Sequence, residues 1–261
     1  MCGVLGAPPV PQGSWEREAR LVSTAALRRT AGPAAHPPAE PAAEPATEPP
    51  TEPAAEAAER LAVRLRATPG VRRVDVRPNG FLVVEIATPG EIVDELLAAP
   101  AAVPSPRAAS APDSVAPWPD FPRTWDNPGF AVRYAYVRAG AVQRWARDLG
   151  VPAGAAAGAA AGVAAGAAVR PELLDGPFDR AVLRVLAELP SRRDSRDPGW
   201  AAYLERLAEV YHAAVERASP IPRGDEPPTE AHAARVRMGE AVRRVLGEGL
   251  AELGVAPPDK I

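Results

Sequence analysis

The chain has 261 residues, of which 33 are proline and 21 glycine, and alanine makes up much of its 46% apolar fraction. A formal net charge of −3 gives no overall nucleic-acid signature, and the single cysteine, Cys2, excludes an internal disulfide and a CxxC metal site. The sequence has no apolar run long enough for a membrane span and no secretory signal pattern, so we expect a cytoplasmic protein.

Residues 1–54 are rich in proline, alanine and glutamate, and the stretch PAEPAAEPATEPPTEPAAE repeats this theme. Such a segment buries too little apolar surface to offset the entropy lost by ordering the chain. We therefore predict a disordered N-terminal tail over residues 1–54, with room for one short helix around Trp15 to Leu27.

Residues 55–99 have the pattern of a small α+β unit. Leu61 and Leu65 stand at helical spacing before a Pro-Gly break, and VRRVDVRPNGFLVVEIAT has the alternation and central turn of a β-hairpin. The following PGEIVDELLAA predicts a second helix. We expect this α-β-β-α unit to depend on the rest of the chain, because it is too small to be stable alone.

The remaining sequence is predicted to be helical. Residues 100–120 are typical of a Pro/Ala/Ser linker, and AGAAAGAAAGVAAGAA at 153–168 is typical of a flexible inserted loop. Apolar periodicity predicts helices over 126–150, 178–189 and 198–218, and Thr229 can cap a last helix. The fold class is therefore mainly α, with a four- or five-helix bundle over residues 121–261.

The helix predicted at 126–150 has two distinct faces. Its apolar stripe, which we expect to pack against the bundle, comprises Phe130, Tyr134, Val137, Ala141, Trp145 and Leu149. A neighbouring face combines cations, a ring for stacking and a glycine for close approach, and comprises Arg133, Tyr136, Gly140, Arg144 and Arg147. Such a face suits a nucleic acid. The alternative is an ordinary solvated face, because arginine outnumbers lysine 29 to 1 throughout the chain.

Four segments resemble arginyl-tRNA synthetases. The stretch from Asp126 is similar to that family's DNPVYYVQYAHAR, with matches at Asp126, Asn127, Pro128, Tyr134, Ala135 and Arg138. YLERLAEVYH at 203–212 resembles the segment before the family's anticodon-facing loop, and RVLGEGLAELGVAPPDKI resembles its C-terminus. TPGVRRVDVRPNGFLVVEI resembles part of its N-terminal tRNA-contacting domain. The matches follow the family's chain order and cover residues 55–98 and 121–261.

The resemblance implies a DALR-type anticodon-binding helical bundle over 121–261, preceded by a remnant of the N-terminal tRNA-contacting domain over 55–99. In the synthetases a catalytic domain with HIGH and KMSKS motifs lies between these parts, and we find neither motif here. We therefore expect an aminoacyl-tRNA synthetase paralogue that is not an enzyme, with no catalytic residues, cofactor or metal. Its implied partner is a tRNA, with arginine tRNA as the first candidate.

The cationic helix face and the resemblance together assign roles to individual residues. The candidate tRNA-binding residues are Arg133, Tyr136, Arg144, Arg147 and the C-terminal Ile261. The residues expected to serve the fold are Tyr134, Arg138, Trp145, Tyr203, Tyr211 and His212.

The sequence also departs from the family pattern. Val83 replaces the asparagine of PGFLN, Ile261 replaces a methionine, and residues 213–216 lack the family's aromatic and asparagine. Losing a stacked ring costs about 1–3 kcal/mol per base, so we expect tRNA binding to be weaker than in the enzymes. Two other functions stay open. One is a protein-interaction scaffold that has lost RNA binding, and the other is a subunit that acts in trans with a separate catalytic chain.

Overall fold

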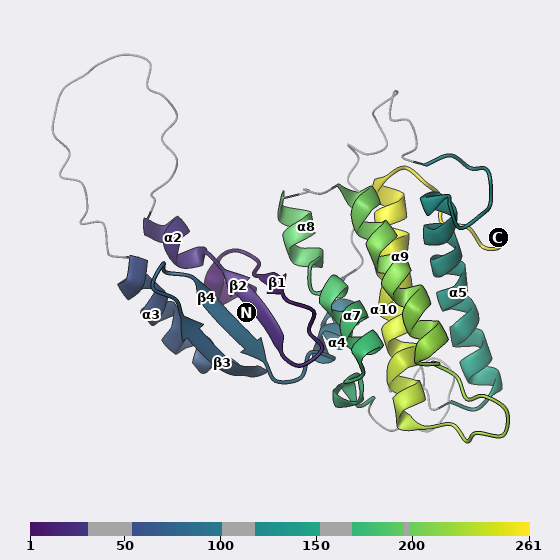
Figure 1. Cartoon of the computed structure of the whole chain (residues 1–261), viewed down its shortest axis with the longest axis horizontal. Coiled ribbons are helices and arrows are strands. Elements are labelled where there is room, and N and C mark those ends of the chain that lie inside the picture. Colours follow the sequence, from purple (N-terminus) through teal and green to yellow (C-terminus); the bar gives the residue numbers. More distant parts are fainter. Residues whose placement is uncertain (31–53, 101–117, 152–168, 196–198) are drawn as a thin grey trace, which may run out of the picture. The chain divides into compact units, whose positions relative to one another are not determined.

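The computed structural model describes residues 1–30, 54–100, 118–151, 169–195 and 199–261 (Figure 1). The chain divides into a sheet unit, residues 1–13 and 17–87, and a helical unit, residues 14–16 and 88–261. Helices predominate, beside one small four-stranded sheet. Most of the predicted linker and the predicted loop at 153–168 lie outside the described residues, as does the stretch 31–53 of the predicted tail.

The sheet unit is an antiparallel sheet with three helices. The strand order is β1-β2-β4-β3, with β1 at Val10–Gln12, β2 at Ala19–Ser23, β3 at Val71–Val76 and β4 at Leu82–Ile86. The helices are α1 at Cys2–Leu5, α2 at Ala25–Thr30 and α3 at Ala54–Arg66.

The predicted hairpin and the helix before it are confirmed. Strands β3 and β4 pair antiparallel around a turn in which Gly80 has a φ of +77°, a conformation that glycine adopts without strain. Leu61 and Leu65 of α3 are buried, and α3 packs against β3. The apolar run of β4 is buried because the strand lies inside the sheet, with a neighbour on each side.

The predicted disorder of residues 1–54 is wrong for its first 30 residues. Strand β2 pairs with β4 along its whole length, from Ala19 opposite Ile86 to Ser23 opposite Leu82. Its side chains alternate, since Ala19, Leu21 and Ser23 are buried. The short helix allowed for around Trp15 to Leu27 is also misplaced, because β2 occupies residues 19–23 and α2 begins only at Ala25. The physical reason is that β4 would otherwise present an unpaired edge, which this short strand covers.

The helical unit is built around three long helices, α5, α9 and α10, and α7 packs against α9 (Figure 1). Its elements are α4 at Glu91–Ala98, α5 at Pro128–Asp148, η1 at Pro171–Leu173, α7 at Pro177–Leu186, α8 at Leu189–Ser195, α9 at Trp200–Arg217 and α10 at Glu230–Glu252. Among the described residues, no helix combines the length and apolar character needed to cross a bilayer.

Helix α4 belongs to this helical unit, so the predicted α-β-β-α unit over 55–99 is wrong in its last element. Arg237 of α10 donates to Asp94 at 2.9 Å, and Arg244 donates to the carbonyl of Leu97 at 3.0 Å. At the start of α4, a Cβ on Gly90 would lie 2.1 Å from the carbonyl oxygen of Pro171. Only glycine allows this close approach. Because α4 makes these contacts with the helical unit, the boundary between the two units lies between residues 87 and 88.

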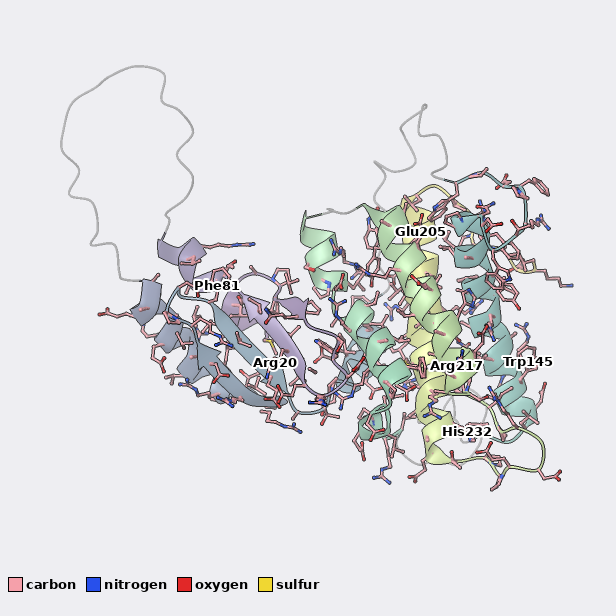
Figure 2. The ribbon with its side chains drawn as sticks, viewed as in Figure 1. Arg20, Phe81, Trp145, Glu205, Arg217 and His232 are labelled. Atoms are coloured by element: carbon pink, nitrogen blue, oxygen red, sulfur yellow. The ribbon has the colours of Figure 1, made fainter. Side chains whose placement is uncertain are left out.

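The packing face of α5 is also not the predicted one. Trp145 is 49% exposed and Leu149 47% exposed, although both belong to the predicted stripe. Figure 2 labels Trp145 toward the C-terminal end of α5. The buried face consists of small side chains, which are Val132, Ala135, Ala139, Val142 and Ala146. Small side chains let α5 approach α10 closely.

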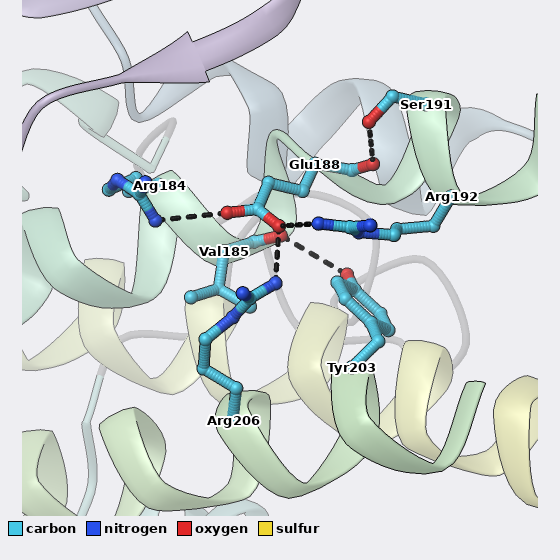
Figure 3. A network of polar contacts seen from close by, with 7 residues as sticks. All are labelled: Arg184, Val185, Glu188, Ser191, Arg192, Tyr203 and Arg206. Atoms are coloured by element: carbon cyan, nitrogen blue, oxygen red, sulfur yellow. Dashed lines mark hydrogen bonds and ion pairs between the residues drawn. The ribbon is translucent and has the colours of Figure 1, made fainter. Parts of the chain in front are cut away.

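One buried carboxylate joins α7, α8 and α9 (Figure 3). The Glu188 side chain is 4% exposed and accepts hydrogen bonds from Arg184 at 2.9 Å and from Arg192 at 3.0 Å. It also forms an ion pair with Arg206 of α9. Nearby, the hydroxyl of Tyr203 donates to the carbonyl of Val185 at 3.2 Å. Tyr203 and Tyr211 are both buried in the core of the bundle.

Candidate nucleic-acid interface

The segment that resembles the synthetase motif begins α5 with a buried cap. The side-chain oxygen of Asn127 accepts from the backbone of Gly129 at 3.0 Å, and its amide donates to Pro119 and Pro122 carbonyls at 2.9 Å each. Pro128 occupies the first helical turn, where a missing N–H costs nothing. The Asp-Asn-Pro sequence therefore sets where the helix starts and how the preceding segment, residues 118–126, is held.

An aromatic cluster lies beside this cap. The ring centroid of Trp125 lies 5.6 Å from that of Phe130, 5.4 Å from that of Tyr134 and 5.2 Å from that of His212 on α9. Tyr134 also stacks on His212 at 5.5 Å. Trp125 is 60% exposed, so the cluster offers one large ring to solvent.

His212 is held as a neutral ring. Its Nδ1 lies 3.3 Å from Nη1 of Arg138, which can only donate, so Nε2 carries the proton and donates to the Ala131 carbonyl at 3.0 Å. Burial lowers the pKa of His212, and the neighbouring Arg138 lowers it further. Arg138 also lies 3.5 Å from the carboxylate of Glu216. These contacts tie α5 to α9.

Two of the predicted tRNA-binding residues do not lie on a free cationic strip. The side chain of Arg133 is 15% exposed and donates to Asp120 at 2.9 Å. The ring of Tyr136 is covered by the guanidinium of Arg243 from α10, at 4.8 Å, and packs against Gly247. The helical wheel places both residues on the same side of α5 as Arg144, but it carries no information about what covers that side.

Arg144 and Arg147 are exposed, and the structure adds Arg243 to them. A Cβ on Gly140 would lie 3.1 Å from Nε of Arg243 and 3.6 Å from Nη1 of Arg144, so the two guanidinium groups converge over this glycine. Arg147 donates to the carbonyl of Gln143 at 3.3 Å. Within the described ranges, no carboxylate lies at ion-pair distance from these three arginines. We call Arg144, Arg147 and Arg243 the basic patch.

The sequence prediction missed Arg243 because this residue lies about a hundred positions away on another helix. The one available signal was Gly140, whose missing side chain leaves room for a group from a neighbouring helix. Ile261, the last predicted binding residue, is 40% exposed at the C-terminus. Its role stays a prediction.

Comparison with curated proteins finds an arginine–tRNA ligase from Clavibacter sepedonicus that is 38% identical to this chain over 144 residues. The match covers 53% of this chain but 24% of that ligase, so the chain spans about a quarter of its relative. No protein-family profile matches the chain, and the search of solved structures gave no significant match. Part of the chain is thus similar to part of an arginine–tRNA ligase.

Proposed function

We propose that this chain is a non-catalytic tRNA-binding protein whose helical unit acts as a DALR-type anticodon-binding domain. The observation that carries the proposal is the basic patch, in which Arg144 and Arg243 converge beside an aromatic ring without a carboxylate partner among the described residues. Two like charges held this close favour an anion between them, and a phosphate group supplies it. The similarity to an arginine–tRNA ligase supports tRNA as the nucleic acid.

The absence of catalysis is part of the proposal. The match covers 24% of the ligase, and the sequence has neither of the two motifs that hold ATP in those enzymes. We propose that the protein acts in the cytoplasm on arginine tRNA, without a cofactor. The purified chain should show no arginine-dependent exchange between ATP and pyrophosphate, with or without tRNA.

The binding proposal is tested by a salt titration of tRNA affinity. The test variant changes Arg144, Arg147 and Arg243 to glutamine, and each lost phosphate contact should reduce the slope of log K against log salt by about 0.7–0.9. The triple variant should therefore bind tRNA more weakly, with a slope smaller by about 2 to 3.

A matched control variant removes three other arginine charges from the helical unit. Arg170, Arg193 and Arg223 are exposed, and Arg170 and Arg193 form ion pairs with glutamates. Changing these three to glutamine should leave the slope nearly unchanged. Equal slopes for both variants would mean that the basic patch does not contact RNA, and the protein-interaction scaffold would become the better explanation.

A further inference from the structure

A pocket of about 610 Å³ lies within the helical unit, between α9 and the segment that leads into α5. The residues that decide its chemistry are Trp125 and Ala131 on one side and Glu205, Glu209, His212 and Glu216 of α9 on the other. The four α9 residues are separated by four, three and four positions, so they follow one face of that helix. Figure 2 labels Glu205 near the N-terminal end of α9.

The pocket is acidic. Glu205 accepts from the indole of Trp118 at 2.5 Å, a neutral donor that leaves its charge in place. Glu209 is exposed, and no cation in the described ranges lies at ion-pair distance from it. The pair at positions 205 and 209 puts like charges one helical turn apart, which destabilises a helix. A bound cation would relieve this repulsion.

The cations near the pocket already have partners. Arg206 lines the pocket, but its guanidinium forms an ion pair with the buried Glu188. Arg138 is held between His212 and Glu216, and His212 is a neutral ring. The formal charge that faces the pocket is therefore negative, so a phosphate group would be repelled there.

The wall opposite the glutamates is aromatic. Trp125 lines the pocket and is 60% exposed, and its position is set by contacts with Phe130, Tyr134 and His212. An indole ring is the strongest aromatic partner for a cation. Carboxylates on one wall and an indole on the other are the two groups that a planar guanidinium contacts best, because it stacks on a ring while donating to carboxylates.

We propose that this pocket binds an arginine side chain presented by a protein partner. The partner is a peptide segment, because Trp125 and Glu209 are both exposed and an arginine that projects from the surface of a partner can reach them. Lysine should bind more weakly, since its compact ammonium neither stacks nor donates in a planar fork. The site goes beyond tRNA binding and uses none of the residues of the basic patch.

The proposal is tested with the full chain and two blocked pentapeptides, one with a central arginine and the other with citrulline. Citrulline keeps the shape of arginine and loses its charge. Binding is followed by the NMR signal of the Trp125 indole N–H, which Trp125→Phe assigns. The arginine peptide should bind about tenfold or more tightly than the citrulline peptide and more tightly than free arginine. Equal binding of the two peptides, or tighter binding of free arginine, would overturn the proposal.

Glu209→Gln tests whether the peptide binds in this pocket. Glu172→Gln is its control, because Glu172 is an exposed glutamate outside the pocket. Glu209→Gln should weaken binding of the arginine peptide about threefold to tenfold, and Glu172→Gln should leave this binding unchanged. Glu209→Gln also removes a like-charge contact, so its melting temperature should not fall and unfolding cannot mimic the loss. Unchanged peptide binding by Glu209→Gln would refute the site. Competition by tRNA for the same indole signal, with tighter tRNA binding by Glu209→Gln, would assign the pocket to RNA instead.

Discussion

The carboxylate of Glu188 is expected to be a main contributor to the stability of the helical unit. Its side chain is 4% exposed and forms ion pairs with Arg184, Arg192 and Arg206, which come from three different parts of the bundle (Figure 3). Glu188→Ala removes the negative charge and leaves the arginines facing one another. Breaking a buried ion pair costs about 3–5 kcal/mol, and the lower end applies here because the arginines are partly exposed to water.

The expected shift follows from this free energy. A loss of about 3 kcal/mol lowers the melting temperature of a domain of this size by about 6–12 °C. The shift in melting temperature is measured by thermal unfolding, monitored by circular dichroism at 222 nm. Glu188→Gln, which keeps the shape and one acceptor, should lie between Glu188→Ala and the unchanged chain.

Glu172→Ala is the control for Glu188, because Glu172 is exposed and its ion pair with Arg170 is solvent-screened. Glu172→Ala should leave the melting temperature nearly unchanged. Equal melting temperatures for Glu188→Ala and Glu172→Ala would refute the argument, because they would show that burial of Glu188 adds nothing to its ion pairs.

Two further predictions concern pH and the first strands. Burial lowers the pKa of both His212 and His232 below the ordinary 6.5, so the stability that depends on their neutral rings is full above pH 6.5 and is lost as pH falls through the lowered values. Urea titrations between pH 8 and pH 5 should show this loss, and the double variant His212→Gln, His232→Gln should show less of it; an equal loss in both proteins would contradict the assignment. Deleting residues 1–23 removes β1 and β2 and leaves a two-stranded sheet that is marginal alone, so the backbone amides of β4 should exchange rapidly with solvent. Amides of β4 that stay protected in the shortened chain would show that its pairing with β2 is dispensable.

Local patterns in the sequence were sufficient to predict several helices and strands. The helix that contains Leu61 and Leu65, the hairpin around Gly80 and the last helix capped by Thr229 all appear where the sequence predicts them. Each depends on interactions between residues close in the chain, which are helical spacing, a glycine turn and a side-chain cap. The same holds for Asn127 and Pro128, whose role at the start of α5 is local.

Tertiary structure decided the rest, because the deciding contacts join distant residues. Strand β2 has five residues and no strong strand signal, and its order comes from pairing with β4 some sixty positions later. The packing face of α5 consists largely of alanine, which carries little hydrophobic signal, so the periodicity pointed to Trp145 and Leu149 although both are exposed. The basic patch and the acidic pocket each combine side chains from two segments, so the pattern of a single helix contains only part of either site. Sequence periodicity thus located the three long helices of the helical unit, whereas close packing between helices determined which side chains meet.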